Sequence, residues 1–210
     1  MPAERLHLVR HGEVHNPGHV LYERIPGFGL SETGREMTRA AAAHVAGLGR
    51  PVTRLVCSPL QRTRESAEPF SEAFGLEPQA DERVIEPWNA FAGKRMKRAV
   101  MNPLNWRLLV NPSRPSWGEP FADTAARVVA AMTDAWDAAD GGDVVIVSHQ
   151  APIWLAHLAV AGEKLAHSPT KRRCALSSVT SFDRPGTGPT GFAEIAYAEP
   201  AQAGIDLGAV

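Results

Sequence analysis

The stretch at residues 143–147 constrains the fold of this chain more than any other. It reads Asp-Val-Val-Ile-Val, and after its first residue it is apolar without an alternating polar face. Such a run is typical of a strand buried on both faces, as in parallel sheets covered by helices on either side. It ends at Ser148, His149 and Gln150, which places a histidine where the strand gives way to the next element.

The rest of the chain alternates between strand-like and helix-like segments. Further strands are expected near residues 6–9, 53–57, 84–85, 179–182 and 192–197. Helices are expected near residues 32–48, 60–74, 123–139 and 152–161, with Ser31 capping the first and Pro69 kinking the second. This order predicts an α/β fold with a mostly parallel sheet and helices on both of its faces.

Bulk composition excludes several functional classes. The chain has 210 residues, and its net charge of -1 gives no reason to expect nucleic acid or an anionic membrane as a partner. No apolar run approaches the ~18–20 residues that span a bilayer, and the first residues lack the pattern of a secretion signal. Cys57 and Cys174 make no disulfide framework. We therefore expect a cytoplasmic protein whose residues 1–210 form a single domain.

Residues 88–117 stand apart from the alternating pattern. They show no clear periodicity and mix tryptophans with basic side chains. A long loop of this kind in a compact domain is often a lid or a binding element, so we expect a lid-like insertion here. The chain after about residue 199 is rich in alanine and glycine and is expected to form a loose tail.

Side chains suited to phosphate chemistry follow the first predicted strand. Arg10 and His11 come directly after it, and Gly12 lets the backbone turn there without Cβ strain. A cation beside a histidine lowers the pKa of the imidazole, and a neutral imidazole is a nucleophile. Arginine is the side chain best shaped to hold a phosphate. The pair therefore indicates phosphoryl transfer through histidine.

Comparable side chains follow the other predicted strands. Ser58 and Arg62 follow the second strand, Glu86 follows the third, and His149 follows the strongest one. In open α/β sheets, ligands bind beyond the carboxyl ends of the strands. We therefore expect these side chains to meet at one edge of the sheet.

Six sequence blocks follow one another between residue 6 and about residue 155. They are Leu-Val-Arg-His-Gly-Glu at 8–13, Leu-Ser-Glu-Thr-Gly-Arg at 30–35, Cys-Ser-Pro-Leu-Gln-Arg-Thr at 57–63, Ile-Glu at 85–86, Gly-Glu at 118–119 and Val-Ile-Val-Ser-His at 145–149. In this order they resemble the histidine phosphatase superfamily with its phosphoglycerate mutase-like members. The resemblance implies a three-layer α/β/α sandwich around a mostly parallel central sheet, and it implies no metal or other cofactor.

The resemblance also implies a role for each matched side chain. His11 would be the nucleophile that becomes phosphorylated, while Arg10 and Arg62 would clamp the phosphoryl oxygens. His149 would donate a further hydrogen bond to them, and Glu86 would protonate the leaving oxygen and then activate water. Because a transferring phosphoryl group spreads negative charge over its oxygens, two arginines and a histidine are suitable stabilisers. A glutamate normally ionises near pH ~4.3, so the role of Glu86 requires a raised pKa.

Two departures from the family pattern concern substrate binding. Val14 stands where members often carry Thr or Ser, and Asn16 lies five residues after His11 instead of six. Asn16 reaches the phosphate only if this loop has a different shape, and both outcomes stay open. The segment after Glu86 is also altered, to Pro-Trp-Asn-Ala-Phe-Ala-Gly. These changes leave the identity of the substrate open.

Three alternative sites have weaker support. Glu82 competes with Glu86 as the acid, but it sits between Asp81 and Arg83 and is expected to be solvated. Histidines at positions 7, 11, 15 and 19 would form a metal-binding stripe only on a helix, which the intervening glycines and proline disfavour. Cys57 lacks the arginine spacing of a cysteine phosphatase and is expected to be a small buried residue.

We therefore predict a metal-independent phosphatase that hydrolyses small phosphomonoesters through a phosphohistidine and releases inorganic phosphate. The alternatives are a phosphoglycerate mutase-type transfer and a low-turnover phosphate-ligand sensor or phosphohistidine carrier. The oligomeric state stays open, with a homodimer among the alternatives, and the basic triplet at 171–173 is expected to be a solvated cluster. The candidates for substrate binding are Asn16, Tyr22, Arg24, Ser58, Lys94, Arg95, Arg98 and Gln150.

Overall fold

A six-stranded sheet forms the centre of the computed structural model, which describes residues 1–95, 101–108 and 117–201. The strand order is β3-β2-β4-β1-β5-β6. The strands β3, β2, β4 and β1 pair in parallel, whereas β5 runs antiparallel to both β1 and β6. The strands are β1 (Arg5–Arg10), β2 (Val52–Cys57), β3 (Gln79–Ala80), β4 (Asp143–Ser148), β5 (Val179–Asp183) and β6 (Ala193–Ala198). The sheet is thus mixed, and parallel pairing joins its central strands β2, β4 and β1.

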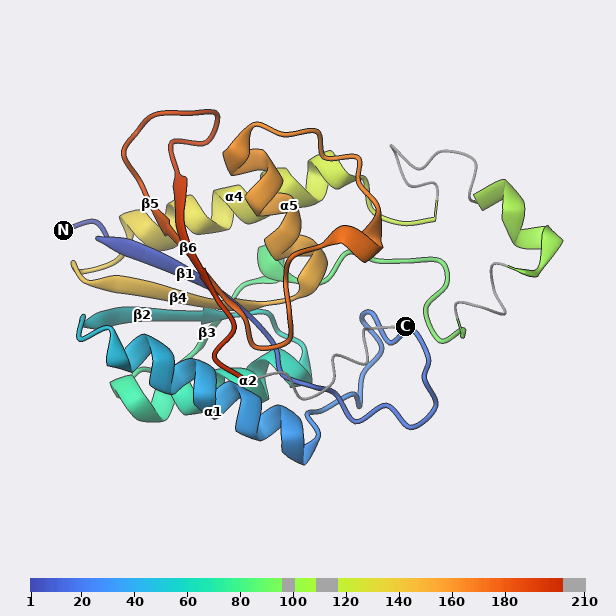
Figure 1. Cartoon of the computed structure of the whole chain (residues 1–210), viewed down its shortest axis with the longest axis horizontal. Coiled ribbons are helices and arrows are strands. Elements are labelled where there is room, and N and C mark those ends of the chain that lie inside the picture. The colour runs from blue at the N-terminus through green and yellow to red at the C-terminus, as the bar shows by residue number, and fades with distance from the viewer. Residues whose placement is uncertain (96–100, 109–116, 202–210) are drawn as a thin grey trace.

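Helices cover both faces of this sheet. Figure 1 shows α1 and α2 on one face and α4 and α5 on the other. The predicted three-layer α/β/α arrangement is therefore confirmed. The helices are α1 (Glu32–Gly47), α2 (Gln61–Phe74), α4 (Phe121–Asp137) and α5 (Gln150–Ala161), with short 3-10 helices η1 (Glu82–Val84), η2 (Pro103–Leu108) and η3 (Pro169–Lys171).

Alternate side chains of β4 pack into two separate cores. Val144 and Ile146 join the cluster that includes side chains of α4 and α5, whereas Val145 and Val147 join the cluster with α1 and α2. All four valine and isoleucine side chains are fully buried. Because both faces of this strand are covered, it needs apolar residues at every position, and the sequence pattern at 143–147 reflects its central place.

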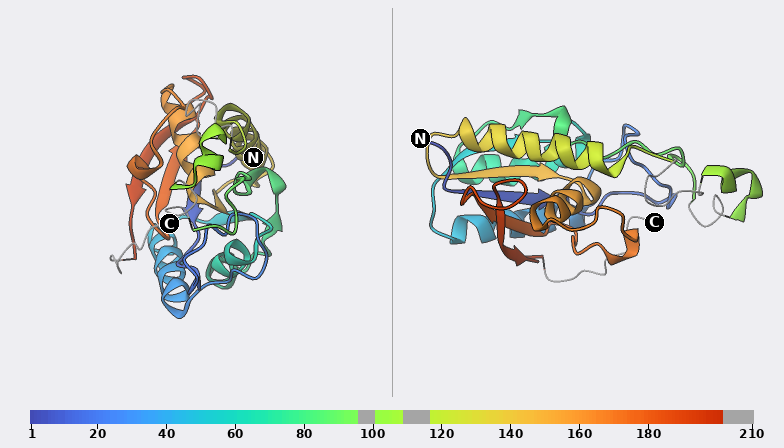
Figure 2. Two further views of the ribbon diagram at one scale, coloured as in Figure 1. Left: turned by 90° about the vertical axis from the view of Figure 1, so that its right-hand side faces the viewer. Right: turned by 90° about the horizontal axis from the view of Figure 1, so that it is seen from above.

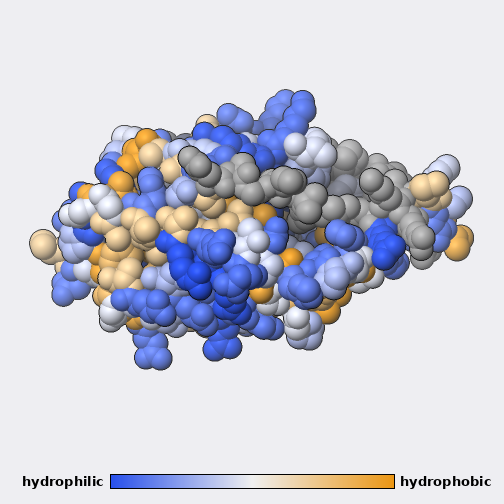
Figure 3. Space-filling model, turned by 60° about the horizontal axis from the view of Figure 1, so that its bottom comes forward, coloured by the Kyte–Doolittle hydropathy of each residue, from blue (hydrophilic) through white to orange (hydrophobic). Residues whose placement is uncertain are grey.

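The start of α1 shows why its boundary is predictable. Ser31 Oγ accepts a hydrogen bond from the backbone N–H of Gly34 at 2.9 Å, which satisfies one of the free donors at the helix end. The exposed side of this helix carries Glu32, Glu36 and Arg39, and hydrophilic residues gather over it in Figure 3.

None of the helices in the described parts of the chain has the length and apolar character needed to cross a membrane.

The strand predicted at residues 84–85 is wrong. The segment forms the end of η1, and the short strand β3 lies earlier in the chain, beside β2 at the sheet edge. Asp81 caps η1 by accepting a hydrogen bond from the backbone N–H of Arg83 at 2.8 Å. Val84 is fully buried within the core on the α4 side. Its apolar character therefore reflects packing and not strand pairing.

The two ends of the predicted insertion at 88–117 lie side by side. The backbone N–H of Ala90 donates to the carbonyl of Trp117 at 2.6 Å, next to an isolated bridge between Asn89 and Gly118. Between these ends, η2 lies away from the sheet and its covering helices (Figures 1 and 2). Residues 96–100 and 109–116 and the predicted tail beyond residue 201 lie outside the described residues. A lid-like role of the insertion stays a prediction.

Candidate active site

The carboxyl ends of β1 and β4 bring two histidines together. His11 follows β1 and His149 follows β4, and the centroids of their rings are 5.2 Å apart. The two strands pair in parallel as far as Arg10 and Ser148, and the backbone N–H of His11 donates to the carbonyl of Ser148 at 3.0 Å. The register of this strand pair therefore sets the spacing of the two rings.

The turn after His11 has room only for glycine. A Cβ atom at Gly12 would lie 2.3 Å from the carbonyl oxygen of Gly34 in α1. The backbone N–H of Gly12 donates to Ser66 Oγ in α2 at 3.2 Å. Contacts with two helices thus fix the backbone that carries the predicted nucleophile.

His11 is held in a neutral form with one nitrogen available for attack. Its Nδ1–H donates to the carbonyl of Gly12 at 2.8 Å, so the unshared electron pair belongs to Nε2. Burial lowers the pKa of His11 well below its usual value, and the charges of Arg62 and Arg10 lower it further. At neutral pH the imidazole is therefore uncharged, as a nucleophile must be.

Three buried nitrogen donors of the predicted site residues have no hydrogen-bond partner in the described parts of the chain. They are Nε of Arg10, Nε of Arg62 and Nδ1 of His149. Arg10 Nη1 donates to the carbonyl of Cys174 at 2.5 Å, and Arg62 Nη2 donates to the carbonyl of Glu23 at 2.7 Å. Each arginine is only 1% exposed. An unpaired buried donor costs about 1–3 kcal/mol, so three of them in one place are typical of an anion-binding site.

Ser58 fixes the ring of His149. Ser58 Oγ lies 2.8 Å from His149 Nε2, and both side chains are fully buried. The other nitrogen, Nδ1, lies 3.8 Å from a carboxylate oxygen of Glu86, which favours a proton on Nδ1. We therefore assign Ser58 as the donor to Nε2 and Nδ1–H as the donor that faces the site. Burial and the charge of Arg62 hold the pKa of His149 well below its usual value, so it donates in its neutral form.

The carboxyl groups of Glu86 and Glu23 lie near these arginines. Burial raises the pKa of Glu86 above its usual value, although Arg62 and Arg172 oppose the shift. Burial and the nearby Glu86 raise the pKa of Glu23 to about 8. A carboxyl group with a raised pKa can donate a proton near neutral pH, which is the property required of a general acid.

Two arginines form hydrogen bonds with the backbone at and near Glu86. Arg24 Nε donates to the carbonyl of Glu86 at 2.6 Å, and Arg24 Nη2 donates to Glu119 at 3.1 Å. Arg127 Nε also donates to Glu119 at 2.6 Å, and Arg127 Nη1 donates to the carbonyl of Arg83 at 2.5 Å. The position of the candidate acid thus depends on Arg24 and on α4.

The structure brings most of the predicted site residues together. Tyr22 lies close to His11 and Arg62, with its ring centroid 6.4 Å from that of His11 and 4.8 Å from the Arg62 guanidinium carbon. Gln150 is half-buried and begins α5 directly after His149. The residues gathered at this edge are Arg10, His11, Tyr22, Arg24, Ser58, Arg62, Glu86, His149 and Gln150.

The remaining predicted residues make other contacts. The amide of Asn16 forms hydrogen bonds with the backbone of Val20 at 2.8 and 3.2 Å, within its own loop. Lys94 is exposed, with its ammonium 5.8 Å from the ring centroid of Phe91. Arg95 Nε donates to the carbonyl of Gly18 at 3.0 Å. Arg98 lies outside the described residues, and a substrate contact by any of these side chains stays a prediction.

Sequence reasoning missed Glu23 and Arg172. The expectation of a solvated cluster at 171–173 is wrong for Arg172, which is half-buried and donates to His167 Nε2 at 2.9 Å. Burial lowers the pKa of Arg172, and the charges of Glu86 and Glu23 oppose this. Glu23 lies between the predicted site residues Tyr22 and Arg24, and this position could have indicated it as a site residue. The basic triplet at 171–173 carries no such indication for Arg172. Across the described ranges, no group of three or more His, Cys, Asp or Glu is placed to hold a metal ion.

Comparison with known proteins agrees with this geometry. The family model of the histidine phosphatase superfamily (branch 1) matches residues 6–191. The uncharacterized protein Rv0525 of Mycobacterium tuberculosis (strain ATCC 25618 / H37Rv) is 42% identical over 205 residues, which cover 96% of this chain and 99% of that protein. The probable phosphoglycerate mutase GpmB of Escherichia coli is 29% identical over 150 residues, 69% of each chain.

A solved structure shares the fold. The mycobacterial glucosyl-3-phosphoglycerate phosphatase Rv2419c, in complex with inorganic phosphate, superposes with a TM-score of 0.74. The two chains are 23% identical, and the match covers 95% of this chain and 100% of the other. The family match over residues 6–191, nearly the whole chain, shows that this protein belongs to the histidine phosphatase superfamily, branch 1.

Proposed function

We propose that this chain is a metal-independent phosphatase that hydrolyses phosphomonoesters through a phosphohistidine at Nε2 of His11. One observation carries the proposal: the unpartnered donors of Arg10, Arg62 and His149 surround a histidine whose free nitrogen is a nucleophile. The two guanidinium groups supply positive charge where a transferring phosphoryl group accumulates negative charge. The phosphatase and mutase names among the similar proteins support phosphoryl transfer as the class of reaction.

The first step transfers the phosphoryl group to the protein. His11 Nε2 attacks phosphorus and forms an N–P bond while the bond from phosphorus to the leaving oxygen breaks. Glu86 in its protonated form, which burial favours by raising its pKa, gives its proton to that oxygen and becomes a carboxylate. Arg10, Arg62 and the Nδ1–H of His149 hold the phosphoryl oxygens through the transfer.

The second step releases phosphate. The Glu86 carboxylate takes a proton from a water molecule, whose oxygen attacks phosphorus as the N–P bond breaks. His11 returns to its neutral form, Glu86 is again protonated, and inorganic phosphate leaves. In a mutase, the hydroxyl group of a second substrate would replace this water, which makes the acceptor the difference between the two activities.

The experiment measures phosphate release from p-nitrophenyl phosphate in excess chelator. We expect the wild-type protein to turn over under these conditions and His11→Ala to lose activity by about a thousandfold or more. His15→Ala is the matched control, because His15 is exposed in the same loop. Loss of wild-type activity in chelator, or activity retained by His11→Ala, would overturn the proposal. Phosphoryl transfer to an added alcohol without phosphate release would favour a mutase.

A further inference from the structure

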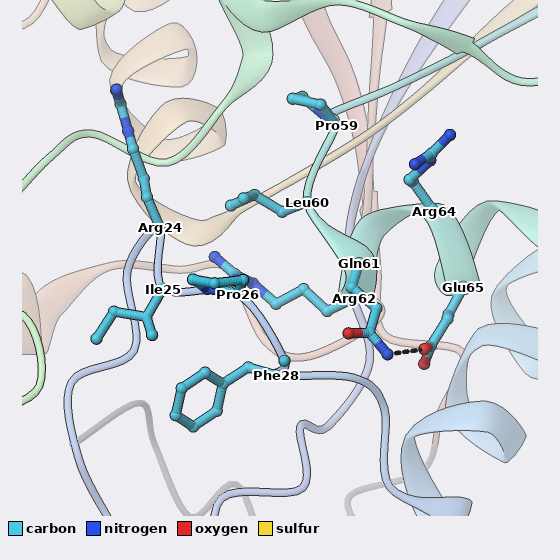
Figure 4. Close-up of a pocket in the computed structure, with 11 residues that line it drawn as sticks. Arg24, Ile25, Pro26, Phe28, Pro59, Leu60, Gln61, Arg62, Arg64 and Glu65 are labelled. Carbon is cyan, nitrogen blue, oxygen red and sulfur yellow. Dashed lines mark hydrogen bonds between the residues drawn. The ribbon is translucent and has the colours of Figure 1, made fainter.

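A cavity of about 450 Å³ lies between the loop at residues 24–28 and the start of α2 (Figure 4). Its volume falls within the range of about 300–1,000 Å³ that is usual for small-molecule sites. Ile25 and Phe28 line one side, and Pro59 and Leu60 line the other. The Phe28 ring also stacks on Tyr22, with centroids 5.3 Å apart. These walls suit a flat apolar group.

The cavity adjoins the catalytic residues at two points. Arg62 lines it and also belongs to the phosphate clamp proposed above. Arg24 lines it and donates to the carbonyl of Glu86. Glu86 itself does not line the cavity, so a leaving group whose oxygen lies next to Glu86 would reach the cavity past Arg24 and Arg62.

The charged side chains that line the cavity differ in whether they already have partners. The Glu65 carboxylate in the lining already accepts hydrogen bonds from Gln61 at 2.7 Å, from the backbone of Leu30 at 2.7 Å and from Arg35 at 3.2 Å. The Arg64 side chain is exposed, and its guanidinium makes no hydrogen bond or ion pair with the residues that the structure describes. Figure 4 shows Arg24 and Arg64 rising from opposite sides of the cavity. The lining therefore offers a second anion-binding group beyond the phosphate clamp.

We propose that this cavity is the leaving-group subsite, and that it takes an aromatic or similarly flat apolar alcohol whose second anionic group is bound by Arg64. The proposal rests on the proposed function, since it assigns the leaving group of the same reaction. A carboxylate on the leaving group would form charge-assisted hydrogen bonds with the guanidinium of Arg64. The apolar walls would exclude water from the face of the ring.

The test compares phenyl phosphate with 4-carboxyphenyl phosphate, which carries a second anion and is also a slightly better leaving group. We expect the wild-type kcat/KM to be higher for the carboxylated substrate by about fivefold, as for a favourable exposed ion pair. Arg64→Gln should remove the part of this preference that lies in KM and leave the part in kcat that comes from the better leaving group. Arg39→Gln, which removes an exposed arginine from α1, is the matched control and should keep the preference. An equal preference in wild type and Arg64→Gln would overturn the subsite.

A binding measurement separates this proposal from the proposed function. His11→Ala protein is titrated calorimetrically with each of the two esters, with and without Arg64→Gln. We expect the same preference in dissociation constants, and its loss in the double variant. Equal affinity for both esters would overturn the subsite even if the wild type is an active phosphatase. If the wild type hydrolysed neither ester but His11→Ala still bound the carboxylated ester more tightly through Arg64, the proposed phosphatase function would be wrong and the subsite would stand.

Discussion

Two histidines at opposite ends of β1 have opposite surroundings. His7 lies towards the amino end of the strand, with Nδ1 2.8 Å from Ser181 Oγ and Nε2 3.2 Å from Asp143. Asp143 is bound in turn by Arg50 through hydrogen bonds of 2.9 to 3.1 Å. His11 follows the carboxyl end, and its Nε2 makes no hydrogen bond within the described ranges. Both rings are buried, at 0% and 3% exposure.

The comparison shows that residue type alone does not identify a catalytic site. Ser181, His7 and Asp143 are the residue types of a hydrolytic triad. Here both ring nitrogens of His7 are occupied, and Ser181 and Asp143 are buried with it. This closed network can stabilise the fold but presents no free nucleophile. At the other end of the strand, unpartnered donors and a free ring nitrogen make chemistry feasible.

The largest expected contrast comes from replacing each histidine by alanine. His11→Ala should lose phosphatase activity by about a thousandfold or more with little change in the free energy of unfolding. His7→Ala should lower the free energy of unfolding by about 2–4 kcal/mol, because it leaves buried groups without partners. Turnover of p-nitrophenyl phosphate and urea unfolding measure the two effects. If both variants lost activity and stability together, the distinction between the two ends would fail.

The contribution of the His7 network to stability should depend on pH through Asp143. Burial opposes its ionisation, but hydrogen bonds from His7 and Arg50 hold its pKa below the usual value. The ionised form therefore stabilises the folded state above the unfolded-state pKa of about 3.9, and this contribution is lost as the pH falls through the folded-state value.

Asp143→Asn should therefore lower the free energy of unfolding by about 1–3 kcal/mol at neutral pH, since it breaks an ion pair whose carboxylate is buried and whose arginine is partly exposed. The difference from wild type should shrink below about pH 4, where the carboxylate of the unfolded state becomes protonated, and should continue to shrink until the folded-state carboxylate is protonated too. Urea unfolding over a pH series measures this. Asp140→Asn is the control, because Asp140 is fully exposed. A difference that is constant with pH would contradict the assignment.

Ser58→Ala tests the support of the active-site histidine. Loss of the hydrogen bond to His149 Nε2 should lower kcat by about ten- to a hundredfold, because the ring loses its orientation and its Nδ1–H tautomer. KM and the unfolding midpoint should change less. Ser58→Thr keeps the hydroxyl group and should retain more activity than Ser58→Ala. Equal activity of wild type and Ser58→Ala would refute the positioning role.

Glu23→Gln should have the smallest effect, confined to alkaline pH. The pKa of Glu23 is raised to about 8, so it is neutral below this pH and negatively charged above it. The charge repels the phosphate of the substrate, so wild-type kcat/KM should fall above about pH 8. Glu23→Gln should lessen this fall and leave the part that comes from ionisation of Glu86, whereas Glu82→Gln, at an exposed glutamate, should not change it. An unchanged alkaline limb in Glu23→Gln would count against this role.

The sequence predicts those site residues whose place follows from strand ends. Arg10 ends β1, His11 follows it, and His149 follows β4. Parallel pairing of β1 and β4 brings the residues at these strand ends to one edge of the sheet. The 3-10 helix η1 is not predictable in this way, because Val84 is buried by packing in η1 and gives the same apolar signal as a strand.

Contacts between distant segments are beyond local patterns. Arg172 lies in a basic triplet that resembles a solvated surface, and only the fold turns it towards Glu86 and Glu23. The bond between Ser58 and His149 joins residues from two different strand ends. The cavity beside Arg64 likewise depends on how one loop sits against α2. Such features require the relative placement of elements, which periodicity and spacing do not contain.

Trapping the phosphoryl group tests the central claim most directly. The protein is mixed with p-nitrophenyl phosphate and quenched in alkali, and the peptides are analysed by mass spectrometry. A tryptic peptide from His11 to Arg24 also contains His15 and His19, so fragmentation must locate the modification. We predict a phosphoryl group on His11 that is acid-labile and absent from His11→Ala. A phosphoryl group on a different residue, or turnover that persists in His11→Ala, would contradict the account.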